Sequence, residues 1–142
     1  AIEVSCWSFL DLARRAEKLM VNGGTMLTMS YHGANEVIEN YGIMGPVKAA
    51  LESAVRYVAA ELGPKGIRVH AVSPGPLATR AASGLRDFDE LMERVSAKAP
   101  VRRLVTIDDV LEALSALDHH PKGPPGGKPA RMKSAARVGV AA

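Results

Sequence analysis

Cysteine, aromatic residues and long apolar runs are all scarce in this sequence, and each scarcity excludes a class of protein. The single cysteine, Cys6, cannot form an internal disulfide. The sequence therefore does not indicate a disulfide-stabilised secreted domain, and we expect a cytoplasmic protein. No apolar run approaches the roughly 18 residues of a membrane-spanning helix, so we expect no membrane association. The 142 residues, 47% of them apolar, suffice for about one globular domain.

Acidic residues are absent after Asp118, which divides the chain into two regions of different charge. Residues 1–118 contain 13 basic and all 15 acidic residues, a net charge of −2, and the other five basic residues follow. Residues 119–142 contain four Pro and four Gly without periodicity, so we expect a basic tail without regular structure. The tail has no aromatic residue for base stacking, and we expect no nucleic-acid partner.

The body of the chain has the pattern of an α/β protein with a parallel sheet. We expect a helix capped by Ser5 over 5–20, a short buried strand over 25–29 and a long helix over 46–62. A second strand is expected over 67–72, bounded by Gly/Pro turns. Strand, helix and strand in this order predict a right-handed parallel crossover.

Two shorter helices are expected after this crossover. One starts at Asp87 or Asp89 and runs to about Lys98, before Pro100. The other reaches about Leu117 and starts at a capping-box-like pattern, with Thr106 three residues before Asp109.

Chemically suggestive residues lie between the first strand and the long helix, in SYHGANEVIENYGIMGPVK, which covers Ser30 to Lys48. A phenol such as Tyr41 is a poor proton donor at neutral pH unless a cation, here Lys48, stabilises its anion. Pro46 is tolerated in a first helical turn, which places Tyr41 just ahead of the helix that carries Lys48. A tyrosine so supported can hydrogen-bond an oxygen that gains negative charge in a reaction.

Both expected strands end in distinctive loops, one with Ser30 and Tyr31 and the other with the sequence SPGPLATR. Ligands of parallel sheets bind beyond the carboxyl ends of the strands. The two loops therefore predict a site at that edge.

With these features in place, residues 1–110 resemble the short-chain dehydrogenase/reductase superfamily, and within it the NADH-dependent enoyl-acyl-carrier-protein reductases. The resemblance is carried by GGTMLTMSY, NYGIMGPVKAALE, RYVAAELGPKGIRVHAVSPGPLATRAASG and APVRRLVTIDDV. The seven residues from Tyr41 to Lys48, longer than the usual interval of the superfamily, resemble the enoyl reductases in particular.

The resemblance implies reduction of the C2–C3 double bond of an enoyl thioester on acyl carrier protein, with NADH as cofactor. It implies that Tyr41 stabilises the thioester oxygen, that Lys48 holds the nicotinamide ribose and that Tyr31 lines the acyl pocket. The further cofactor contacts implied are Ser30, Leu77 and Thr79. The substrate wall implied is Met44, Ala81, Ala82 and Phe88. In the family the long helix packs against another subunit, which implies a homotetramer.

A glycine-rich dinucleotide turn is missing, because no G-x-G-x-x-G pattern occurs. We therefore expect a partial Rossmann-like doubly wound parallel sheet without its N-terminal half. Residues 1–118 would be the C-terminal part of a reductase domain. The change of composition after about Val110 suggests the hypothesis of a misread reading frame, which resequencing of the DNA tests. The alternatives are another short-chain reductase acting on a ketone or alcohol, and an inactive fragment that acts as a binding module.

Overall fold

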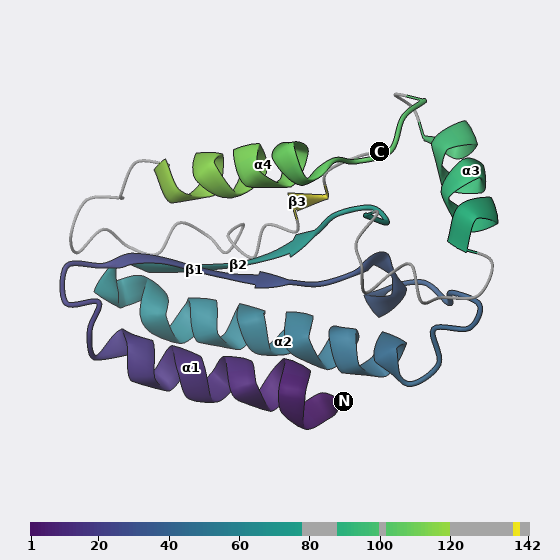
Figure 1. The fold of residues 1–142 in the computed structure, drawn as a ribbon. Helices are drawn as coiled ribbons and strands as arrows, with labels where there is room; N and C mark the ends of the chain where they lie inside the picture. The colour runs from purple at the N-terminus through teal and green to yellow at the C-terminus, as the bar shows by residue number, and fades with distance from the viewer. Residues whose placement is uncertain (78–87, 100–101, 120–137, 140–142) are drawn as a thin grey trace.

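Parallel strands form the sheet on which the helices pack (Figure 1). The structure is a computed structural model that describes residues 1–77, 88–99, 102–119 and 138–139. Strand β1, Gly24–Met29, pairs in parallel with β2, Ile67–Ser73, with Gly24 opposite Ile67. Strand β3, Val138–Gly139, pairs in parallel with the end of β2. The expected α/β class with a parallel sheet is confirmed.

The helices occupy both faces of this sheet. Helix α1, Ser8–Glu17, and helix α2, Met44–Leu62, cover one face, and α4, Ile107–His119, covers the other (Figure 1). Helix α3, Phe88–Lys98, stands beyond the ends to which the strands point. Two short 3-10 helices, η2 at His32–Ala34 and η3 at Gly63–Lys65, flank α2 in the chain. The long connection from β1 to β2 therefore contains α2, as expected.

The first helix differs from the sequence-based expectation. A π-helical turn, η1 at Glu3–Trp7, precedes α1, and Ser5 lies inside this turn instead of capping a helix. Phe9 and Ala13 are buried, but Leu12 is 65% exposed and Leu19 is 83% exposed. Leu19 lies beyond the end of α1, whose buried residues are Phe9 and Ala13, and Leu10 packs against the core as a partly buried residue. The helix therefore also ends before residue 20, the end expected from the sequence.

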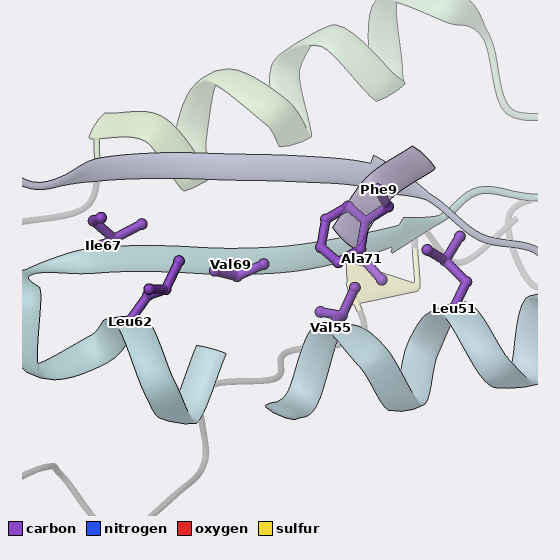
Figure 2. Close-up of a cluster of buried hydrophobic side chains, with 7 residues drawn as sticks. All are labelled: Phe9, Leu51, Val55, Leu62, Ile67, Val69 and Ala71. Atoms are coloured by element: carbon purple, nitrogen blue, oxygen red, sulfur yellow. The ribbon is translucent and has the colours of Figure 1, made fainter. Parts of the chain in front are cut away.

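A cluster of apolar side chains fills the space between the sheet and helices α1 and α2 (Figure 2). Its members come from α1, α2 and β2: Phe9, Leu51, Val55, Leu62, Ile67, Val69 and Ala71. Burial of one such large side chain stabilises a fold by about 1.5–3 kcal/mol. Strand β2 lies at the centre of this core, whereas β1 exposes 37% of Leu27 and 40% of Met29. The expectation that the first strand is fully buried is therefore wrong.

The start of α4 has the expected cap. Asp109 accepts a hydrogen bond from the Thr106 backbone N–H at 2.8 Å, and Thr106 Oγ1 accepts one from the Asp109 N–H at 3.2 Å. These two bonds satisfy N–H groups that the first turn of a helix leaves unpaired. Near the other end of α4, the Arg68 side chain donates to the Asp118 carbonyl at 2.8 Å. Helix α4 is thus connected by a side chain of β2 to the sheet.

The tail differs from its expected lack of regular structure at Val138 and Gly139, which form β3. Val138 lies opposite Val72 and Gly139 opposite Ser73. A parallel strand takes its hydrogen bonds from the backbone, so a segment without apolar periodicity can supply one. The other tail residues after His119 lie outside the described residues.

Candidate active site

Ser30 and Tyr31 are positioned by the carboxyl end of β1. The Ser30 N–H donates to the Val72 carbonyl at 2.8 Å, which continues the pairing of β1 with β2 by one residue. Tyr31 has an extended backbone, with φ −150° and ψ 152°, and η2 begins directly after it. Ser30 is buried and Tyr31 is half-buried. The strand end therefore delivers both side chains where the sequence predicted them.

Tyr41 lies three residues ahead of α2, in a turn whose backbone is left-handed on both sides of it. Asn40 has φ 62° and Gly42 has φ 49°. The Met44 N–H donates to the Tyr41 carbonyl at 3.1 Å and ties the turn to the start of the helix. Left-handed φ values suit Gly and are tolerated by Asn better than by most residues. The prediction that Tyr41 precedes the helix is confirmed.

The two phenol rings contact one another. Their centroids are 4.9 Å apart and their planes are tilted by 57°, a favourable arrangement for two aromatic rings. The Tyr41 ring also lies against Gly33 of η2, where an added Cβ would come within 2.6 Å of Tyr41 Cδ1. Gly33 therefore leaves the space that the ring occupies. Gly33 was not among the residues predicted from the sequence, where its only signal is a glycine two residues after Tyr31.

Both phenols are protonated at neutral pH. Burial raises the pKa of Tyr31 above its ordinary value. Burial, and then the neighbouring Tyr31, raises the pKa of Tyr41. A nearby ammonium lowers the pKa of a phenol, so the shift of Tyr41 runs against the effect expected of Lys48. The pair consists of two hydroxyl donors, the form that stabilises an oxygen on which negative charge grows.

Lys48 lies in the second turn of α2 and reaches back to the end of β1. Its ammonium donates to the Met29 carbonyl at 2.9 Å. Burial lowers the pKa of Lys48 below its ordinary value. The ammonium has two further N–H donors for a ligand at this edge of the sheet.

Glu52 follows Lys48 by one helical turn and also contacts the end of β1. Its Oε1 accepts a hydrogen bond from Ser30 Oγ at 2.6 Å, and its Oε2 accepts one from Asn35 Nδ2 at 3.4 Å. The sequence analysis missed Glu52 as well. The signal was its spacing, because residues i and i+4 share a helix face and Lys48 was already a candidate. We call residues 29–44, together with Lys48 and Glu52, the site corner.

The remaining predicted residues are placed only in part. Met44 is the first residue of α2, and Leu77 follows β2. Both are half-buried. Phe88 begins α3, but its side chain lies outside the described part of the structure. Thr79, Ala81 and Ala82 also lie outside the described residues.

Neither a metal cluster nor a membrane span is present within the described ranges. Residues 1–77, 88–99, 102–119 and 138–139 contain no group of three or more His, Cys, Asp or Glu side chains that could hold a metal ion. In the same part of the chain, no helix has both the length and the apolar content that a membrane crossing needs.

Comparisons with known proteins agree with this arrangement. The sequence model of a family described as enoyl-(acyl carrier protein) reductase matches residues 1–119. The NADH enoyl-[acyl-carrier-protein] reductase FabI of Rickettsia prowazekii is 47% identical over 110 residues, which are 78% of this chain and 42% of the relative. The second such reductase of Rhizobium meliloti is 50% identical over 75% of this chain and 40% of its own length. The chain thus spans less than half the length of these relatives.

Solved structures show the same likeness. The Bacillus cereus enoyl-acyl carrier protein reductase, solved with NADP+ and an indole naphthyridinone, has a TM-score of 0.78 and 41% identity. The match covers 80% of this chain and 44% of that protein. The reductase of Anaplasma phagocytophilum, solved with NAD, has a TM-score of 0.72 and 43% identity, with coverage of 80% and 41%. The partial Rossmann-like architecture expected from the sequence is confirmed by these structures.

Proposed function

Because this chain belongs to the enoyl-(acyl carrier protein) reductase family, we propose that it performs the NADH-dependent reduction of the C2–C3 double bond of an enoyl thioester. The observation that carries the proposal is the pair of protonated, contacting phenols at the carboxyl edge of a parallel sheet, where Lys48 also binds the Met29 carbonyl. The substrate is the thioester of acyl carrier protein, as the names of the relatives state for those proteins. NADH, when bound, supplies the hydride for C3 of the substrate.

Tyr41 is the hydrogen-bond donor to the thioester oxygen. This oxygen gains enolate character when C3 is reduced, and a donor aimed at it lowers the energy of the transition state. The raised pKa keeps the phenol protonated at neutral pH, so a donor is present throughout the reaction. A proton from solvent then reaches C2 and completes the saturated thioester, directly or through a relay that includes Tyr41.

The site corner fits the nicotinamide end of the cofactor. Lys48 has N–H donors beyond the one that binds the Met29 carbonyl, and these suit the hydroxyls of a ribose. Ser30 and Leu77 follow the two adjacent strands β1 and β2, on the same edge of the sheet. Thr79 is proposed as a further cofactor contact. The chain has no G-x-G-x-x-G turn, so the proposal assigns it no pyrophosphate site of that kind.

The acyl chain of the substrate needs an apolar wall. We assign Tyr31 to this wall as well as to the phenol pair, because it is half-buried and its ring contacts that of Tyr41. Met44, at the start of α2, continues the wall. Ala81, Ala82 and Phe88 complete the proposed set.

Assembly into a homotetramer is part of the proposal. Helices α1 and α2 pack against the sheet, yet Trp7, just before α1, is 66% exposed and Ile43, just before α2, is 68% exposed. Exposed apolar side chains that form one contiguous patch mark a surface that contacts another subunit. We also propose a cytoplasmic location, in agreement with the single cysteine. Light scattering after size exclusion measures the mass in solution, and a monomer at all concentrations would contradict the tetramer.

The test of the activity is NADH oxidation by the 142-residue chain with a crotonyl thioester. We expect thioester-dependent oxidation that Tyr41→Phe lowers by about 100-fold or more, the usual range for a positioned donor. Tyr57→Phe is the matched control, because Tyr57 is an exposed phenol on the outside of α2. Oxidation with a 3-ketoacyl thioester alone would indicate the alternative ketone reductase. No oxidation with either substrate would contradict the proposal that this chain is itself an enzyme.

A further inference from the structure

Two successive turns of α2 hold the end of β1. Lys48 binds the Met29 carbonyl, and Glu52 binds the Ser30 hydroxyl at 2.6 Å. The second carboxylate oxygen of Glu52 binds Asn35 at 3.4 Å. Ser30 and Asn35 flank the segment 31–34, which contains Tyr31 and η2. One side chain of α2 therefore holds both ends of this segment.

The same segment sets the position of Tyr41. Gly33 is buried in its middle, and the Tyr41 ring lies against it with no space for a Cβ. The Tyr31 ring contacts the Tyr41 ring, with 4.9 Å between the ring centroids. Any movement of the segment relative to α2 therefore moves one phenol and removes support from the other.

The direction of the Ser30 hydrogen bond has its own consequence. A carboxylate only accepts hydrogen bonds, and a hydroxyl has one proton to donate. Because the Ser30 proton points to Glu52, the Ser30 oxygen offers lone pairs to any ligand. The Ser30 N–H is also taken, since it donates to the Val72 carbonyl. Toward a ligand, Ser30 is therefore an acceptor.

We propose that Glu52 is a positioning residue of this site: it holds Ser30 as a hydrogen-bond acceptor and fixes segment 31–34, with its two phenol contacts, to the helix that carries Lys48. The role of Glu52 in the reaction rests on the proposed function. Its role in holding segment 31–34 does not, and that role can be tested without catalysis. With Ser30 as an acceptor, donation to the thioester oxygen falls to the phenols.

The variants are Glu52→Ala and Glu52→Gln, with Glu61→Gln as the control. Glu61 lies on the same helix and is exposed, so its substitution removes an equal charge far from the site corner. In Glu52→Gln the amide oxygen still accepts from Ser30, and the amide NH2 pairs with Asn35 once the Asn35 side chain turns its Oδ1 toward it. Ala at this position removes both acceptors. Glu52→Gln therefore separates the geometry from the charge.

The first measurement is an absorbance titration of tyrosine ionisation in the 142-residue chain, in a Tyr57→Phe background that leaves only Tyr31 and Tyr41. We expect Glu52→Ala to lower the pKa of the pair toward that of free tyrosine, because a loosened segment admits water to both rings. Glu52→Gln and Glu61→Gln are expected to titrate like the parent. Thermal unfolding is followed in parallel.

The second measurement is the Kd for NADH by calorimetry. We expect Glu52→Ala to weaken binding by about tenfold, the effect of one lost hydrogen bond to a charged group, and Glu52→Gln to restore most of it. A lower melting temperature with an unchanged tyrosine titration would show a merely structural role and overturn the proposal. Equal titrations of all variants would also overturn it. Absence of NADH binding by the parent would refute the proposed function, while the titration would still decide the geometry.

Discussion

The core and the site corner lie on the same helix but are built in different ways. Leu51, Val55 and Leu62 of α2 pack into an apolar cluster with α1 and β2. Lys48 and Glu52, on the same helix, make polar contacts with the end of β1. The core depends on buried apolar area. The site corner depends on hydrogen bonds, on the absence of a side chain at Gly33 and on the left-handed backbone of Asn40 and Gly42. Substitutions can therefore change the stability of the core and the geometry of the site corner separately, although adjacent residues of one helix contribute to both.

The largest expected effect is in the core. Leu51 is only 1% exposed, and Leu51→Ala removes its contacts and leaves a cavity. We expect a loss of about 2–5 kcal/mol in the free energy of unfolding. Urea denaturation followed by circular dichroism measures it. Leu12→Ala is the control, because Leu12 is 65% exposed, and it should change the free energy by about 0.5 kcal/mol or less. Equal losses in the two variants would contradict the placement of the core.

A smaller effect is expected at the contact of Gly33 with Tyr41. Gly33→Ala places a Cβ within 2.6 Å of the ring and forces the ring or η2 to move. We expect a loss of about 1–3 kcal/mol in stability, together with loss of the nuclear Overhauser contacts between the rings of Tyr31 and Tyr41.

Gly63→Ala is the matched control for this variant. Gly63 ends α2 with φ −54°, and a Cβ there meets nothing within 4 Å. The ring contacts should persist, with stability equal to that of the parent or higher by up to about 1 kcal/mol. Intact ring contacts in Gly33→Ala would show that the corner adapts to an added methyl group, and the contrast with the core would weaken.

The left-handed backbone beside Tyr41 predicts a third, weaker effect. Asn40 is exposed and has φ 62°. Asn40→Ala should cost about 1 kcal/mol in the free energy of unfolding, because alanine is less easily accommodated in this conformation. Asn40→Gly should be nearly neutral, since glycine adopts it freely. Thermal unfolding of both variants provides the comparison, and equal stability of the two would contradict a backbone origin.

The smallest effect is expected at the exposed cap of α4, which belongs to neither region. The Arg103 guanidinium, assisted by Thr106, holds the pKa of Asp109 well below its usual range. The folded carboxyl therefore has a lower pKa than the unfolded one. Its contribution to stability is present above the unfolded pKa of about 3.9 and is lost as the pH falls through the folded pKa.

Urea midpoints of the parent and Asp109→Asn measure this contribution across pH. We expect a difference in urea midpoint between the parent and Asp109→Asn that is constant near neutral pH and becomes smaller below about pH 4. Asp108→Asn is the control, because Asp108 lies in the same helical turn and is exposed. Its gap to the parent should be smaller near neutral pH. A gap for Asp109→Asn that widens on acidification would contradict the assigned sign.

Sequence patterns were most informative where a residue acts on its own local backbone. Pro46 predicted that Tyr41 precedes the long helix, and Thr106 and Asp109 predicted the cap of α4. Both were confirmed, because the groups involved are only a few residues apart. The burial of β1 and the start of α1 were predicted wrongly, since both depend on which elements pack against them. The proposed roles of Thr79, Ala81 and Ala82 stay predictions.

The sequence by itself determined the α/β class, the order of the main elements and the residue types of the proposed site, with Tyr31, Tyr41 and Lys48 among them. Periodicity, turn residues and caps are local properties, because each depends on residues that are close together in the sequence. Only the tertiary structure decided that Glu52 binds Ser30, that Gly33 supports Tyr41 and that Lys48 binds the end of β1. These contacts join residues from different elements, and their existence depends on how α2 packs against β2 and η2. No pattern within a short stretch of sequence specifies which residues of different elements come into contact.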